Sequence, residues 1–239
     1  EFGDTGTYIH QSADGVLDLV SDGSINVTVG AAGLVLKGTT PKLTIGDAGA
    51  EDTAIVFDGN AQDYYIGLDD TDDDFKIGLG SAVGTTAHMV IDEAGAITAT
   101  AQPAFLVHPA STQSSFAEDT AVTVVFGTER VDQGGDFASN TFTAPVDGNY
   151  QFNVTLQLQA IETAYDYYQL QLVTSGKNYY EAFDPVGLSD AVYFPMQIQV
   201  LANMDAGNTA VVKIMAAGTG GGAGHDILVE STFSGYLAC

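Results

Sequence analysis

The sequence predicts an all-β protein in two parts: a repetitive, trimeric shaft of short strands over residues 1–100, followed by an antiparallel β-sandwich of the jelly-roll type over residues 101–239. Three observations lead to this prediction. Turn residues return every ~8 to 12 positions, which is typical of many short strands. The chain is rich in glycine (28), phenylalanine (12) and tyrosine (11), which favours strands and tight turns. No segment has the apolar periodicity of an amphipathic helix.

The first part consists of short extended phrases that end in Gly or Asp. From Gly15 to Thr100 they include "SINVTVG", "LVLKG", "KLTIGD", "TAIVFDG", "YYIGLD" and "FKIGLG". Each phrase has only a few apolar side chains, often at alternate positions, so a single chain has little to bury. Several chains wound or stacked together could share a core.

Five aspartates fall within six positions in "DDTDDD", between the phrases "YYIGLD" and "FKIGLG". We interpret the two phrases as paired strands and the acidic run as their link, because charge on an exposed β edge opposes wrong pairing. Asp70, Asp72 and Asp74 alternate like the start of an EF-hand loop, and they are the candidate metal ligands. Phe75 stands where that loop needs glycine, and no bidentate glutamate follows. No cofactor is therefore predicted, with calcium as the weaker alternative.

Beyond a linker marked by Pro103, the predicted strands are longer and alternate cleanly. In "YQFNVTLQLQ" one face is apolar and the other is polar, and "VYFPMQIQVLA" repeats the pattern. "YYQLQLVTSGKNYYEAF" predicts a hairpin about Ser175-Gly176-Lys177, and "TAPVDGNY" predicts a turn between two strands. With the remaining apolar segments, roughly eight strands result, which favours a sandwich or jelly roll.

Three segments of this second part resemble the complement globular-head family, which shares its compact jelly roll with tumour necrosis factor. They are "GGDFASNTFTAPVDGNYQFNV", "MDAGNTAVVKI" and "STFSGYLAC", and Asn208 stands where the family has aspartate. The resemblance covers about residues 104–239. It implies a tight homotrimer with both termini near one end and recognition on exposed loops. Some relatives bind calcium near the trimer axis, but those ligands do not map onto positions in this chain.

The first part is similar in style to the shafts of bacteriophage tail fibres, in phrases such as "DYYIGLDDTDDDFKIGLGSAVGTTAHMVIDEAGAIT". This likeness implies a slender trimeric fibre that carries the globular head at its tip. The chain begins "EFG" without methionine, so we expect a processed chain or a fragment of a longer one.

The charge balance restricts the partners. Acidic residues number 31 and basic residues 6, which gives a formal net charge of −25. Such a chain repels phosphate backbones and anionic lipid, so we expect no nucleic-acid partner. No apolar run approaches the ~18 residues of a membrane span, so no membrane insertion is expected. Cys239 is the only cysteine, which excludes a disulfide framework or a zinc site made of thiolates.

No catalytic signature is present, so we predict that the protein is not an enzyme. The four histidines are far apart, and we interpret each as an exposed or strand-end residue: His10, His88, His108 and His225. The glycine-rich segment "AAGTGGGAGHD" lacks the ending of a phosphate loop and is interpreted as a mobile surface loop. Abundant carboxylates always leave some pair at glycosidase spacing, so a fibre-borne depolymerase is only a minor alternative.

Tyrosines are crowded between residues 165 and 193. Adjacent tyrosines in a strand point to opposite faces, so some must lie outside the core. They are candidates for stacking on a sugar or contacting a receptor, and the candidate residues are Tyr165, Tyr167, Tyr179 and Tyr193. The alternative is that outward rings pack against neighbouring protomers.

Together these observations predict the structural and receptor-recognition part of a trimeric virion fibre, on a phage tail or a capsid, outside the cell. The head would bind a host-surface glycan or protein through multivalency. The alternative is a secreted or cell-surface bacterial globular-head lectin or adhesin without a virus.

Overall fold

The computed structural model describes residues 8–31, 33–187, 189–218 and 225–239. All regular structure in these residues is β, and the strands pair antiparallel, which confirms the predicted fold class. The chain divides into two units, Glu1–Asp47 and Ala48–Cys239. The boundary predicted at residue 100 lies within the second unit, between two sets of strands, and stays a prediction.

The first unit contains one short pair, β1 (Tyr8–His10) with β2 (Asp18–Val20). No strand is assigned among the described residues from 21 to 52, so the strands predicted in "SINVTVG", "LVLKG" and "KLTIGD" are absent from the single chain. The physical reason is the shortage of apolar partners that the phrases themselves indicate. Their large side chains stay exposed, as for Val27 at 60% and Leu34 at 69%.

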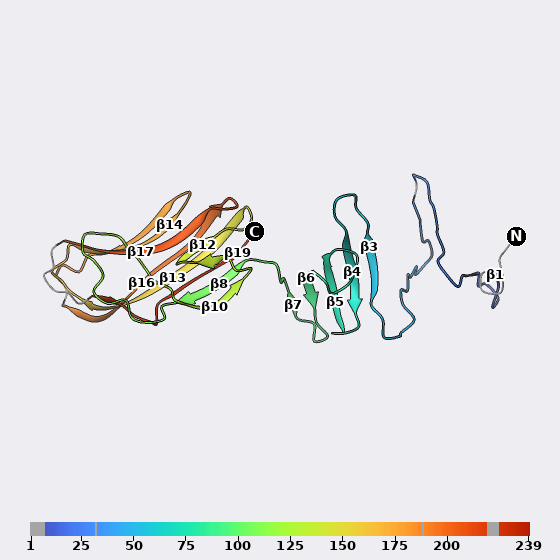
Figure 1. Ribbon diagram of the computed structural model, residues 1–239, viewed down its shortest axis with the longest axis horizontal. Coiled ribbons are helices and arrows are strands. Elements are labelled where there is room, and N and C mark those ends of the chain that lie inside the picture. The colour runs from blue at the N-terminus through green and yellow to red at the C-terminus, as the bar shows by residue number, and fades with distance from the viewer. Residues whose placement is uncertain (1–7, 32, 188, 219–224) are drawn as a thin grey trace. The chain divides into compact units, whose positions relative to one another are not determined.

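The next strands form a meander in which each strand pairs with the one before it (Figure 1). Its strands are β3 (Thr53–Phe57), β4 (Tyr64–Asp69), β5 (Asp74–Leu79), β6 (Ala87–Ile91) and β7 (Ile97–Thr98). The paired strands predicted on either side of the acidic run are confirmed, with Asp69 opposite Asp74 at the end of the β4–β5 ladder.

The remaining strands form two sheets that pack as a sandwich (Figure 1). The first sheet contains, in order, β10 (Thr128–Gln133), β8 (Ala104–His108), β19 (Thr232–Leu237), β13 (Gly148–Ile161) and β16 (Ala191–Met204), with β18 (Asp226–Ile227) beside β13. The second contains β11 (Phe137–Ala138), β12 (Thr141–Thr143), β17 (Thr209–Ala217), β14 (Tyr167–Thr174) and β15 (Asn178–Phe183), with β9 (Val122–Thr123) beside β17.

The order of these strands is that of a jelly roll. The first strand of the sandwich, β8, pairs with the last, β19, and successive segments cross repeatedly between the two sheets. The predicted hairpin about Ser175-Gly176-Lys177 is confirmed as the turn between β14 and β15. The predicted turn in "TAPVDGNY" is also confirmed, and it carries the chain from β12 in one sheet to β13 in the other. Residues 219–224 of the predicted glycine-rich loop lie outside the described residues.

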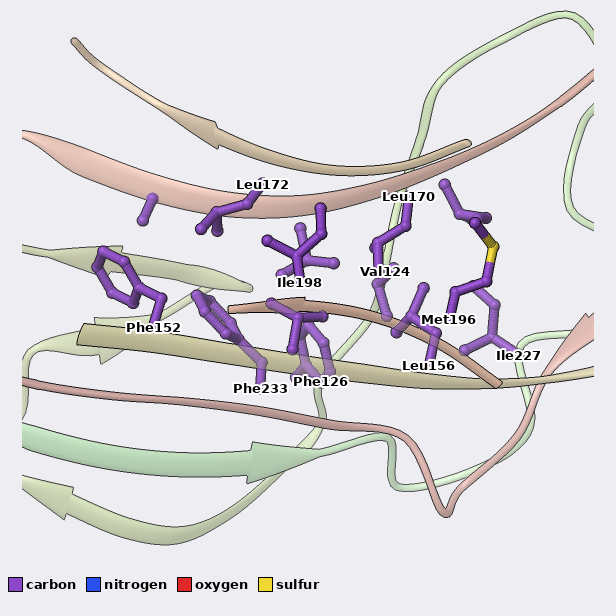
Figure 2. Packing of buried hydrophobic residues seen from close by; sticks show 14 of the residues in the cluster. Val124, Phe126, Phe152, Leu156, Leu170, Leu172, Met196, Ile198, Ile227 and Phe233 are labelled. Carbon is purple, nitrogen blue, oxygen red and sulfur yellow. The ribbon is translucent and has the colours of Figure 1, made fainter. Parts of the chain in front are cut away.

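The core of the sandwich lies between the sheets (Figure 2). Phe152 and Leu156 of β13 face Leu170 and Leu172 of β14, and each of these side chains is fully buried. At one end of the core several phenylalanines pack ring to ring, including Phe105 against Phe142 with centroids 4.8 Å apart. The predicted alternation is confirmed in β13, where the apolar face is buried: Tyr150, Phe152, Val154, Leu156 and Leu158.

Candidate functional site

Four adjacent strands of the first sheet contain no aspartate, glutamate, lysine or arginine. They are β8, β19, β13 and β16. The chain as a whole has 15% charged residues and a net charge of −25. In the second sheet, strands β17 and β15, on either side of β14, carry Lys213 and Glu181. A run of four uncharged strands is therefore particular to the first sheet.

The side chains that point away from the core on these four strands form what we call the charge-free face. The antiparallel register aligns them in rows across the sheet: Tyr236, Gln151 and Leu201; Ser234, Asn153 and Gln199; Thr232, Thr155 and Gln197. Several large members are exposed, with Tyr193 at 62%, Leu201 at 55% and Tyr236 at 49%. The face thus combines neutral amides and hydroxyls with apolar and aromatic rings.

Charged side chains return at the edge strand β10. There Arg130 donates from Nε to Nε2 of His108 across 3.0 Å, and Glu129 and Asp132 lie in the same strand. A neutral centre beside a charged edge is the composition of a protein–protein interface, whose core is depleted of charge. It is also where two strongly acidic copies could approach with the least repulsion.

The four candidate tyrosines do not form one platform. Tyr165 is fully buried and donates from its hydroxyl to Oε1 of Glu118 at 2.5 Å, so its ring offers no surface to a ligand in this structure. Tyr179 lies opposite the buried Leu172 and packs against the core. Tyr167 and Tyr193 alternate with inward-facing neighbours in different sheets.

Burial and the neighbouring carboxylate raise the pKa of the Tyr165 hydroxyl, with burial as the larger cause. The hydroxyl therefore stays a neutral donor to Glu118 at ordinary pH. A ligand-binding role for Tyr167, Tyr179 and Tyr193 stays a prediction. In β14 Tyr168 is fully buried beside the half-buried Tyr167, and in β15 Tyr179 packs against the core beside Tyr180, which is 54% exposed; the adjacent tyrosines therefore face opposite ways.

The three candidate aspartates make separate contacts. Asp72 accepts from Nζ of Lys76 at 2.5 Å, and the backbone amide of Asp70 donates to Oδ1 of Asp52 at 3.0 Å. Asp74 lies in the β4–β5 ladder opposite Asp69. Within the described ranges, no three His, Cys, Asp or Glu side chains are grouped as they would be to hold a metal ion. The calcium alternative stays a prediction.

A buried ion pair, which the sequence analysis missed, anchors this hairpin instead. Nζ of Lys76 lies 2.7 Å from Oδ2 of Asp69, and both side chains are below 10% exposed. Lys76 lowers the pKa of Asp69 through this hydrogen bond, and the two aspartates raise the pKa of Lys76. The available signal was Lys76 itself, a lone cation in a short strand after an acidic run.

His225 lies at a strand end, directly before β18, but it is buried and not exposed. It is 1% exposed and its Nε2 lies 2.8 Å from the carbonyl oxygen of Phe116. Its ring packs against Phe116, Tyr165 and Tyr168. It therefore fills one end of the sandwich core, and spacing along the chain could not show this because its neighbours come from distant segments.

The comparisons with known proteins give likenesses to solved structures only. No family model and no curated protein matches the chain. The globular domain of zebrafish complement 1qA protein is 20% identical, with a TM-score of 0.44, and covers 58% of this chain and 98% of its own. Murine APRIL at pH 8.5 is 9% identical, with a TM-score of 0.42, and at pH 8.0 is 14% identical, with a TM-score of 0.41; each covers 57% of this chain and 98% of its own.

These structures are of the two kinds that residues 104–239 resemble in sequence. Since each TM-score is below 0.5, the jelly-roll topology given above rests on the strand pairing of this chain itself. The matches cover little more than half of the chain, and the likeness of residues 1–100 to virion shafts stays a prediction.

Among the described residues, no helix has the length and apolar character to cross a membrane.

Proposed function

We propose that this chain is the structural and receptor-recognition part of a trimeric virion fibre, with the sandwich as the module that joins three copies and binds the host surface. The charge-free face carries the proposal. Three copies of a chain with a net charge of −25 repel one another least where they meet through uncharged surface, and this face supplies such a surface. The resemblance of residues 104–239 to trimeric heads gives the number of copies.

The proposed mechanism is non-catalytic adhesion outside the cell. Three weak sites on one particle gain effective concentration for one another, which raises avidity without any new contact. Tyr193 and Leu201, on the charge-free face, would contact a neighbouring copy. Host contact would then fall to surfaces outside that face, where Tyr180 is exposed and Tyr167 points away from the core.

The first experiment measures native mass by light scattering. We expect a particle near three times 24.8 kDa. Leu201→Asp places a carboxylate on the charge-free face and should reduce the mass to that of one chain. Val186→Asp is the control, because Val186 is 66% exposed and lies outside the strands. A native particle of one chain, or dissociation by both substitutions alike, would overturn the proposed trimer.

Host binding is tested with the same variants on a panel of bacterial cells and immobilised glycans. The unaltered chain should be retained on a matching surface about 10² to 10⁴ times more strongly than the dissociated Leu201→Asp chain. Because the chain is strongly acidic, its binding to anionic surfaces should change with salt and chelator. Equal retention of both chains would remove the avidity mechanism.

A further inference from the structure

The meander has one face made of apolar side chains, and nothing within the meander covers it. Alternation and register place three positions each of β3, β4 and β5 on this side, with Ile91 and Ile97 continuing it through β6 and β7. We call it the meander face. Its exposed members are large: Ile55, Phe57, Tyr64, Leu68, Phe75 and Ile97, each between 40% and 63% exposed.

On the opposite side of the same sheet, β4 and β5 are covered by the meander's own chain, whereas Val56 of β3 is 39% exposed. Tyr65 is fully buried, and its hydroxyl accepts from the backbone amide of Gly84 at 3.1 Å. A Cβ on Gly67 would lie 2.7 Å from the Val83 side chain, so the loop between β5 and β6 rests on this side. The buried Asp69–Lys76 pair lies there as well. One side of the meander is therefore packed against its own chain, and the meander face is not.

Within the chain, the backbone pairing of the meander is continuous from β3 to β7, with β3 and β7 as its edge strands. Each strand bonds to its neighbours in the chain, and the last strand, β7, has only two residues. A partner is therefore not needed to supply a strand. What the meander lacks is apolar surface, since isolated sheets need a second layer to bury their apolar face.

We propose that the meander face packs against the same face of the other copies of this chain, so that each copy contributes a complete sheet and the copies meet through side chains alone. Ile66 and Ile77, paired at its centre, would lie within the shared core. The number of copies rests on the proposed trimer.

The charge distribution favours a second copy of this chain as the partner that covers the meander face. The meander face carries no ionised side chain at its register positions, whereas the chain has a net charge of −25. A like copy can approach only through uncharged surface, and this face supplies it on both partners. An anionic lipid surface would be repelled.

Continuity along the chain supports the same occupant. β7 ends at Thr98 and β8, the first strand of the charge-free face, begins at Ala104. When copies are joined through the sandwich, the short link between β7 and β8 keeps their meanders close together. The effective concentration of one meander near another is then in the millimolar range.

The test uses the full chain with Cys239→Ser, which removes the single native thiol. One variant carries Ile55→Cys on the meander face, and its matched control carries Val56→Cys. These neighbours are 43% and 39% exposed in one chain but point to opposite sides of β3. Maleimide labelling is measured together with native mass, and again after Leu201→Asp is added.

We expect a trimeric mass. In the trimer, maleimide should label Ile55→Cys at least about tenfold more slowly than Val56→Cys. After dissociation by Leu201→Asp, this protection of the Ile55→Cys thiol should be lost. A trimeric mass with equal labelling would overturn the packing of the meander face and leave the trimeric head standing. A monomeric mass would overturn the proposed trimer, and with it this packing. Protection that survives Leu201→Asp would show that another segment covers the face, which also overturns it.

Discussion

The sandwich and the meander have the same alternating sequence pattern, but they differ in whether the apolar face becomes buried within one chain. In the sandwich, the apolar side of β13 meets that of β14, and more than two dozen hydrophobic residues become buried. In the meander, Tyr65 is the only hydrophobic residue counted as buried among the described positions of β3 to β7. Alternation produces a core within one chain only where the chain also returns with a second sheet.

The largest expected effect that separates the two regions comes from removing one phenylalanine ring. Phe152 is fully buried among Phe105, Phe142 and Phe233. Phe152→Ala should lower the free energy of unfolding of the sandwich by about 3–5 kcal/mol, because the cavity adds to the lost transfer energy. Denaturant unfolding of the full chain measures it.

The matched substitution is Phe57→Ala in the meander, where the ring is 55% exposed. In the dissociated Leu201→Asp chain it should cost less than about 1 kcal/mol. If Phe152→Ala and Phe57→Ala lowered the free energy of unfolding equally, the sandwich and the meander would not differ in how much their apolar side chains are buried.

Two glycine substitutions test the difference in packing between the sandwich and the first unit, with a smaller expected effect on stability. A Cβ on Gly235 in β19 would lie 2.6 Å from the Phe152 ring and 2.7 Å from the Phe105 ring. Gly235→Ala should therefore cost about 1–3 kcal/mol through overpacking, measured as a lower melting temperature. Gly23→Ala in the first unit meets no atom within 4 Å and should leave the melting temperature unchanged. A lower melting temperature for Gly23→Ala, with none for Gly235→Ala, would contradict this difference in packing.

The meander's own anchor predicts a local effect. Lys76→Met keeps the length of the side chain but leaves Asp69 buried without its cation. Amides of the β4–β5 hairpin should then exchange roughly tenfold faster with deuterium, while those of β13 stay unchanged. Hydrogen exchange followed by mass spectrometry resolves the two segments, and uniform acceleration would argue against a local anchor.

The smallest expected effect is a difference in response to acid. Lys76 lowers the pKa of Asp69 below its usual 3.8, so the pair stabilises the hairpin above that pH and loses this contribution as the pH falls through the lowered pKa. Burial raises the pKa of Asp136 in the sandwich, with Asp132 as a second cause, so this group favours the folded state as the pH falls toward 3.8. Hydrogen exchange between pH 5 and pH 3 should therefore show faster opening of the hairpin first.

Lys76→Met is the control for the acid titration, because without its cation the buried Asp69 is destabilising when ionised, so falling pH should no longer speed the opening of the hairpin. A sandwich that opens before the hairpin would contradict the assignment of the two carboxyl groups.

Much of the fold was predictable because alternation and turn residues act locally. The long strands of the sandwich, the hairpin about Gly176 and the hairpin across the acidic run follow from a period of two and from turn chemistry. The strands predicted between residues 21 and 52 are not assigned in the described part of a single chain, because a strand also needs a neighbour, and their formation among several chains stays a prediction. The burial of Tyr165 and His225 was not predictable from the sequence, because it depends on segments far away along the chain.

The all-β class, the acidic character and the absence of charged residues from β8, β13, β16 and β19 can be read from the sequence alone, since they depend on composition and local period. Tertiary structure decided that those four strands lie side by side as one face, that Lys76 pairs with a buried Asp69, and that the candidate tyrosines are divided between two sheets. The reason is that strand order brings together residues that are far apart along the chain, such as Gln151, Leu201 and Tyr236, and a local pattern carries no information about that order.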